Sequence, residues 1–141
     1  MLSATGRRDR EFPHILVVDD DGGLQLLVRG ILEQYGFMVD VAADGRQATE
    51  MAARTKYDAI VCDVVMPHMD GCEFYAGLQQ TDPEQARRLI FVTGAYLDDQ
   101  TRDRLQRTRR TVIRKPFNID EFEQAVAEAL RQGPADGRRS V

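Results

Sequence analysis

The sequence predicts an α/β domain with a doubly wound, five-stranded parallel sheet that is covered by helices on both faces. Three observations predict this class. Short apolar runs typical of buried strands recur along the chain, segments with helical spacing of apolar residues lie between them, and glycine, proline and aspartate separate the two kinds of segment. Strands that alternate with helices form parallel sheets, because each crossover helix returns the chain to the same edge.

The predicted strands are short and mostly apolar. The first is a continuous apolar run, HILVV, of the kind found in a strand that is buried on both faces. The second alternates in character, and the fourth is as apolar as the first. The strands are predicted at residues 14–18, 37–42, 58–62, 89–92 and 111–113.

A helix is predicted after each strand. The first has the clearest periodicity, because its apolar residues recur at intervals of three and four, and Gly36 is placed to end it. Its predicted apolar stripe consists of Leu24, Leu27, Val28, Ile31, Leu32 and Tyr35. In the last helix, Asn118 is the predicted N-cap, and Phe117 and Phe122 occupy the positions of a hydrophobic staple. The remaining helices are predicted around residues 48–52, 74–78 and 97–108.

Composition is typical of one soluble globular domain. The chain has 141 residues, of which 43% are hydrophobic and 30% charged, and its net charge of −4 argues against non-specific binding to nucleic acid. It has no apolar run long enough to span a membrane and no secretory leader pattern at the start, so we expect a cytoplasmic protein without membrane insertion. Cys62 and Cys72 are interpreted as buried hydrophobic residues, since neither has partners at metal-ligand spacing.

The domain is predicted to occupy residues 13–132, between an N-terminal tail at 1–12 and a C-terminal tail at 133–141. Neither predicted tail is long enough to form a DNA-binding module. We therefore do not expect this chain to bind nucleic acid directly.

Reactive side chains follow four of the predicted strands. Asp19 and Asp20 come after the first strand, Asp63 after the third, Thr93 at the end of the fourth, and Lys115 after the fifth. Ligand sites in open parallel sheets form beyond the carboxyl ends of the strands. Clustered carboxylates resist ionisation unless a cation joins them, and Mg²⁺ suits a site of few carboxylates that is completed by a phosphate. A neighbouring lysine and threonine would help to hold a phosphoryl group.

Asp21, the third acid after the first strand, has a simpler interpretation. It is placed to cap the following helix rather than to bind a cation.

Four motifs together resemble the receiver domain of two-component response regulators. They occur in the family's order and spacing, and the resemblance covers residues 13–132. The motifs are HILVVDD at 14–20, DVVMPHMDG at 63–71, FVTG at 91–94 and KPF at 115–117. The resemblance implies a flavodoxin-like fold with strand order 2-1-3-4-5 and a role in phosphorelay signal transduction.

The resemblance also implies a phosphoacceptor and its donor. Asp63 would accept a phosphoryl group from a phosphohistidine of a sensor histidine kinase or a histidine phosphotransfer protein. Lys115 would pair with the Asp63 carboxylate and then with the phosphoryl oxygens, and Thr93 would donate its hydroxyl to the same group. The Lys115-Pro116 bond would be cis. The phosphorylated domain would then bind a downstream protein that the sequence does not identify.

The resemblance further implies a metal site. Asp20 and Asp63 would coordinate Mg²⁺ directly, together with the backbone carbonyl of Val65, whereas Asp19 would act mainly through water. Mn²⁺ would be able to substitute for Mg²⁺.

Two other functions are weighed against this one. An aspartate-nucleophile phosphohydrolase typically has a second aspartate two residues after the nucleophile, but here that position is Val65, which cannot transfer a proton. A receiver-like scaffold that is not phosphorylated would not need the full set of carboxylates, threonine and lysine. We therefore expect self-phosphorylation and dephosphorylation at Asp63 without turnover of a separate substrate.

One position departs from the family pattern. Receiver domains usually have an aromatic residue on the fifth strand, three residues before the lysine, and here that residue is Val112. Val112 is interpreted as a core residue of the strand, and valine is stiff about χ1. We therefore expect the signal to leave through Thr93 and the mostly polar segment 93–108. The basic residues between Arg104 and Lys115 are interpreted either as a docking face or as a solvated helix end.

Overall fold

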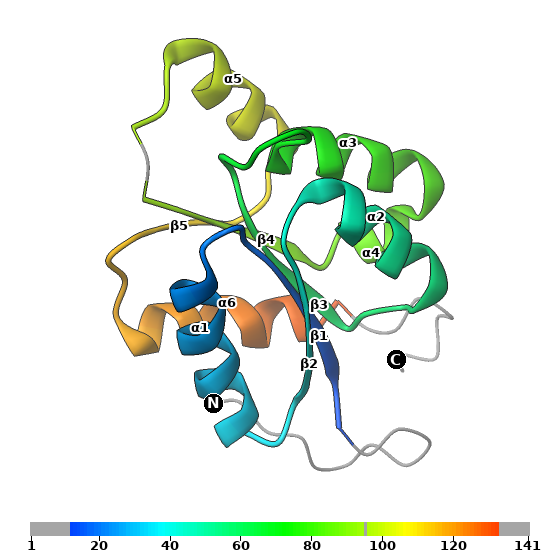
Figure 1. The fold of residues 1–141 in the computed structure, drawn as a ribbon, viewed down its shortest axis with the longest axis vertical. Helices are drawn as coiled ribbons and strands as arrows, with labels where there is room; N and C mark the ends of the chain where they lie inside the picture. The colour runs from blue at the N-terminus through cyan, green and yellow to red at the C-terminus, as the bar shows by residue number, and fades with distance from the viewer. Residues whose placement is uncertain (1–11, 95, 133–141) are drawn as a thin grey trace.

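The protein forms an α/β sandwich around one parallel sheet. The computed structural model describes residues 12–94 and 96–132, so the predicted tails lie almost entirely outside the described residues. The sheet has the order β2-β1-β3-β4-β5, and every neighbouring pair is parallel. Its strands are β1 (His14–Val18), β2 (Met38–Ala42), β3 (Ala59–Asp63), β4 (Leu89–Thr93) and β5 (Val112–Arg114). The predicted class and strand order are confirmed (Figure 1).

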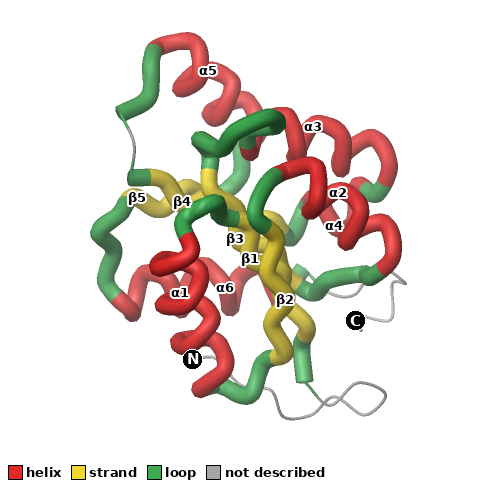
Figure 2. The backbone as a smooth tube through the Cα atoms, in the orientation of Figure 1, coloured by secondary structure: helices red, strands yellow, loops and turns green. Residues whose placement is uncertain are grey.

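Helices cover both faces of the sheet (Figure 2). One face packs against α1 (Gly22–Gln34) and α6 (Ile119–Leu130) through a core cluster that includes Val28, Leu32 and Phe122. The other face packs against α2, α3 and α5 through a second cluster that includes Phe74 and Leu105. The helices on that side are α2 (Gly45–Arg54), α3 (Gly71–Thr81), α4 (Pro83–Ala86) and α5 (Asp99–Thr108). None of the described helices is long and apolar enough to cross a membrane.

The predicted start of the last helix is confirmed. Asn118 caps α6, and its side chain accepts a hydrogen bond from the Glu121 amide at 2.6 Å. The rings of Phe117 and Phe122 stack with centroids 5.2 Å apart, as a hydrophobic staple requires. Cys62 and Cys72 are buried, also as predicted.

Two predictions about buried residues are wrong. Leu27 is 57% exposed although Val28 and Leu32 are buried, because consecutive helical residues point about 100° apart and the buried stripe of α1 is narrower than predicted. Val112 is 38% exposed and therefore is not a core residue. It alternates with the buried Ile113 on β5, the edge strand, where only one face of the sheet is covered at this point.

The short helix α4 was not predicted. Asp82 caps it by accepting a hydrogen bond from the Gln85 amide, and Pro83 occupies its first turn. The side chain of Gln85 is fully buried and accepts a hydrogen bond from the Tyr57 amide at 2.7 Å. A helix of one turn is too short to show periodicity in the sequence. It is held instead by the Asp82 cap and the hydrogen bond between Gln85 and Tyr57.

Candidate functional site

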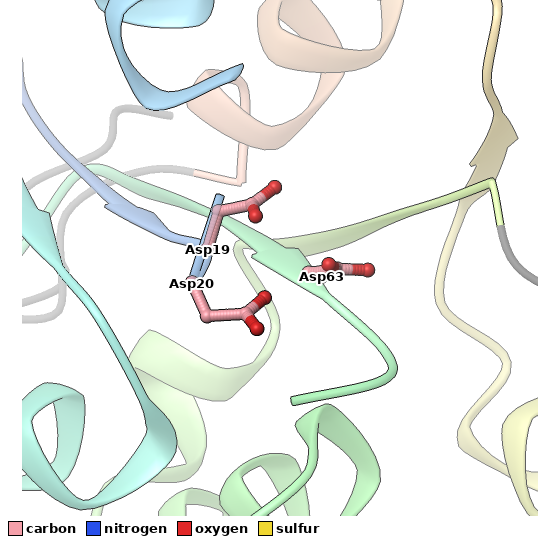
Figure 3. Close-up of side chains that lie close together, drawn as sticks. All are labelled: Asp19, Asp20 and Asp63. Carbon is pink, nitrogen blue, oxygen red and sulfur yellow. The ribbon is translucent and has the colours of Figure 1, made fainter. Parts of the chain in front are cut away.

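Three carboxylates meet where β1 and β3 end. The candidate ligand oxygens of Asp19, Asp20 and Asp63 all lie within 4.8 Å of one another, and Figure 3 shows them gathered at these two strand ends. Asp19 and Asp63 are buried, whereas Asp20 is exposed. β1 pairs with β3 in parallel, so their carboxyl ends reach the same edge of the sheet. The predicted convergence of these acids is confirmed.

Lys115 reaches the same cluster from the end of β5. Its Nζ lies 3.7 Å from Asp19 Oδ2 and 3.9 Å from Asp63 Oδ2. The Lys115 amide donates to the Thr93 carbonyl at 2.9 Å, which fixes the lysine backbone beside β4. The Lys115-Pro116 bond is cis, as predicted. A Cβ at Gly94 would lie 3.2 Å from the Lys115 Cβ, so the small residue after Thr93 makes room for this side chain.

Thr93 presents an unusual hydroxyl. The residue is fully buried, yet its Oγ1 has no hydrogen-bond partner among the described residues. A buried hydroxyl without a partner costs about 1–3 kcal/mol. The hydroxyl is therefore free to donate to another group, and donation to a phosphoryl group stays a prediction.

The backbone after Asp63 is held closely. The Val64 amide donates to Asp63 Oδ1 at 2.7 Å, and the Gly71 amide donates to the Val64 carbonyl at 2.8 Å. A Cβ at Gly71 would lie 2.3 Å from the Asp63 carbonyl oxygen, so only glycine fits there. The loop from 64 to 70 therefore returns to its own start and fixes the Asp63 carboxylate. The side chain of Val65 is 50% exposed, and metal coordination by its carbonyl stays a prediction.

The electrostatics of the cluster favour a cation. Burial, followed by the negative charge of Asp19, raises the pKa of Asp63 to about 6, although Lys115 and the Val64 amide oppose the rise. Burial also raises the pKa of Asp19, against the hydrogen bond from the Asp21 amide and the charge of Lys115. One lysine does not offset three neighbouring acids. A hard divalent cation with oxygen ligands fits this donor set, and Mg²⁺ is the cation that such small carboxylate sites usually hold.

Asp21 lies outside the three-carboxylate group, as predicted. Its side chain accepts hydrogen bonds from the Gly23 and Leu24 amides at 3.0 and 3.2 Å, which caps α1. Its own amide donates to Asp19 Oδ1 at 2.8 Å. The start of α1 is thereby fixed directly to the carboxylate cluster.

A contact between Asp70 and Arg104 was not predicted from the sequence. Asp70 caps α3 in a capping box with Glu73, and its carboxylate also pairs with Arg104 of α5 at 3.3 Å. The Asp-x-x-Glu spacing of Asp70 and Glu73 is a signal that would have predicted the cap. No local signal predicts the ion pair, because its partners are 34 residues apart.

Comparison with known proteins gives a consistent family. The response regulator receiver domain family matches this chain over residues 15–127. The chain is 30% identical over 116 residues to Sporulation initiation phosphotransferase F of Bacillus subtilis, with 82% of this chain and 92% of that protein covered. It is 35% identical over 134 residues to Response regulator MprA of Mycobacterium leprae, with 90% of this chain covered. The chain spans 55% of MprA and 21% of Transcription factor SKN7 of Candida albicans, to which it is 32% identical.

Solved structures show the same likeness. The receiver domain of the sensor histidine kinase PA1611 of Pseudomonas aeruginosa, which has a magnesium ion coordinated in its active-site cleft, is 29% identical, with a TM-score of 0.74 over 84% of this chain and 98% of that domain. The chemotaxis protein CheY4 of Vibrio cholerae is 26% identical, with a TM-score of 0.72 over 84% of this chain and 99% of that protein. The fold, the clustered acids and the sequence match agree: this chain belongs to the response regulator receiver domain family of two-component systems.

Proposed function

We propose that this receiver domain accepts a phosphoryl group on Asp63 in a reaction that requires Mg²⁺. The observation that supports the proposal best is the environment of the Asp63 carboxylate. It is buried at the end of the central strand β3, with Lys115 Nζ 3.9 Å from its Oδ2 and the two other acids beside it. Asp19 shares the lysine and the neighbouring acids, but Asp63 is the member of the three-carboxylate group that lies at the end of the central strand.

Each residue of the site then has a defined task. An Asp63 oxygen attacks the phosphorus of a phosphohistidine, the new O–P bond forms as the P–N bond breaks, and the bond electrons leave with the imidazole. Because the pKa of Asp63 is about 6, the carboxylate is mostly ionised near neutral pH and available as the nucleophile. Lys115 shifts from the carboxylates to the phosphoryl oxygens. The unpartnered Thr93 hydroxyl donates to one of them.

Asp19, Asp20 and Asp63 would hold the Mg²⁺, with the Val65 carbonyl as a further ligand. When bound there, the ion would supply positive charge to offset the charge on the phosphoryl oxygens. Mn²⁺ has the same preference for oxygen ligands and is proposed to substitute.

The donor, the downstream partner and the location complete the proposal. The donor is a sensor histidine kinase or a histidine phosphotransfer protein in the cytoplasm, and the phosphorylated domain binds a further protein. Turnover of a separate substrate is not part of this function. The nearest enzymatic alternative, a phosphohydrolase, would need a proton donor at position 65, and the half-exposed valine there has none.

A phosphorylation assay tests the proposal. The protein is incubated with acetyl phosphate and Mg²⁺, and intact-protein mass spectrometry counts the phosphoryl groups added. We expect one group on the wild type, none on Asp63→Asn, and none on the wild type when EDTA replaces Mg²⁺. Asp103→Asn removes an exposed acid from α5 and is the matched control, which should be labelled like the wild type.

Three results would count against the proposal. An unlabelled wild type would favour a scaffold without phosphorylation. Labelling of Asp63→Asn at another acid would place the acceptor elsewhere. Steady release of phosphate far in excess of protein, with p-nitrophenyl phosphate as substrate, would favour a phosphohydrolase.

A further inference from the structure

The basic run from Arg104 to Lys115 is divided by the structure into parts with different surroundings. Arg104 pairs with Asp70, and Lys115 belongs to the carboxylate cluster. Arg109 and Arg110 lie in the connection between α5 and β5, away from both of these sites. This pair is not explained by the receiver function.

Arg109 and Arg110 line a cavity at the other end of the sheet. The cavity has a volume of about 230 Å³ and is bounded by the residues before β4, the residues before β5 and the C-terminal half of α6. Its polar lining comes mainly from Arg87, Arg109, Arg110, Thr111, Glu128 and Gln132. Asp63 is the last residue of β3, whereas the lining residues Arg110 and Arg87 come just before the amino ends of β5 and β4. The two sites are therefore separated by the length of the strands.

The backbone directs both arginines to the cavity. Arg109 has φ 58° and ends α5 in the left-handed conformation, a position at which glycine or asparagine is usual. The chain turns there, so that two successive residues line the same cavity. The main-chain amide of Arg110 donates to Thr108 Oγ1 at 3.1 Å. The guanidinium Nη1 of Arg110 donates to the Arg87 carbonyl. The bond to Arg87 joins the α5–β5 connection to the residues before β4.

The positive charge of the cavity is only partly compensated. Arg109 and Arg110 form no ion pair with any residue that the structure describes, and the buried Nε of Arg110 has no hydrogen-bond partner there. Arg87 uses one guanidinium nitrogen for Glu84, which does not line the cavity. Among the lining residues that the structure describes, Glu128 is the only acid. The described lining thus contains three guanidinium groups and one carboxylate. A planar guanidinium can donate two parallel hydrogen bonds to two oxygens of a phosphate.

The size of the cavity restricts the ligand. Sites for drug-sized molecules occupy about 300–1,000 Å³, and this cavity is smaller and mostly polar. It has room for one or two phosphate groups, and its few apolar lining residues, Ile90, Ala125 and Ala129, offer little surface to a base or a long acyl chain. We propose that this cavity is an anion site that binds a compact phosphate-class ligand, with pyrophosphate as the simplest example, through Arg87, Arg109 and Arg110.

A titration with pyrophosphate tests this site. The ¹⁵N-labelled protein is titrated in EDTA, without divalent cations, at constant ionic strength set with chloride, and amide shifts are followed by two-dimensional NMR. We expect saturable shifts confined to residues 87–90, 109–111 and 125–132. Asp63→Asn should bind equally well, so that failure of the phosphoacceptor proposal and failure of this one are distinguishable.

Charge-removing variants identify the arginines. Arg109→Asn removes the charge while placing at this position a residue that tolerates the left-handed conformation. It should raise the dissociation constant at least about tenfold, because a charge-assisted bond is lost. Arg54→Gln makes the same charge change at an exposed position on α2, across the sheet, and should bind like the wild type.

Several outcomes would overturn the site. These are unsaturable shifts, shifts centred on other residues, equal binding by Arg109→Asn, or an equal loss of binding in Arg54→Gln, which would indicate a general charge effect. Tighter binding of an unphosphorylated acidic peptide than of pyrophosphate would assign the cavity to a protein partner and would also refute the proposed ligand class.

Discussion

Replacing Asp63 with asparagine should stabilise the metal-free protein near neutral pH. In the folded protein, burial and the Asp19 charge raise the pKa of Asp63 from its ordinary 3.8 to about 6. One pKa unit corresponds to about 1.4 kcal/mol, so the ionised Asp63 carboxylate costs at most about 3 kcal/mol of unfolding free energy above pH 6. The asparagine side chain retains an oxygen that can accept from the Val64 amide. Because the remaining groups can relax, we expect a gain of about 1–2 kcal/mol for Asp63→Asn.

The sign of the pH dependence follows from the raised pKa. Between about pH 4 and pH 6 the folded wild type holds the Asp63 proton more tightly than the unfolded chain does, so its unfolding free energy falls as the pH rises through this window. Asp63→Asn lacks this loss. Its advantage over the wild type should therefore be small near pH 4 and complete near pH 7.5.

Urea denaturation in EDTA at several pH values measures the effect. Asp103→Asn, at an exposed position on α5, is the control and should show no comparable gain. Excess Mg²⁺ should stabilise the wild type and leave Asp63→Asn almost unchanged, because a ligand that binds only the folded state adds to its stability. The reasoning fails if metal-free Asp63→Asn is no more stable than the wild type at pH 7.5, or if its advantage is the same at pH 4.

Three further predictions concern the metal, the loop after Asp63 and the signal. Asp20→Ala should weaken Mg²⁺ binding, measured by calorimetry, more than Asp21→Ala does. The main effect of Asp21→Ala should be a loss of about 1 kcal/mol of stability, because it removes the cap of α1. Equal effects of the two variants on Mg²⁺ affinity would contradict the ligand assignment. Gly71→Ala should lower both stability and the rate of labelling by acetyl phosphate because its Cβ would strike the Asp63 carbonyl, whereas Gly77→Ala, with open space around it, should stabilise α3 by about 0.5–1 kcal/mol. Beryllofluoride with Mg²⁺ should change hydrogen exchange most in residues 93–108, and a change centred on α1 or α2 would place the output elsewhere.

The strands and the site could be predicted because both follow from short-range rules. Buried parallel strands are continuous apolar runs, and their carboxyl ends share one edge, so the sequence alone predicts that Asp19, Asp63 and Lys115 meet. The cis bond before Pro116 came from the family resemblance rather than from the residues.

The features that were missed depend on packing between distant segments. The exposure of Leu27 is set by how much of α1 the sheet and α6 cover, and that of Val112 by the open face of an edge strand. α4 is a single turn that is fixed by Asp82 and by the buried side chain of Gln85. These arrangements leave no periodic signal in the sequence.

The double role of Asp70 has a consequence for the timing of the switch. One carboxylate caps α3, at the end of the loop that begins at Asp63, and also pairs with Arg104 of α5. If that loop moves, the Asp70 carboxylate moves with it and its ion pair with Arg104 is disturbed. If α5 moves, Arg104 pulls on the same carboxylate and disturbs the cap of α3. Loop and helix then relax together, at one rate, so relaxation-dispersion measurements at Glu73 and Leu105 should report a single exchange process.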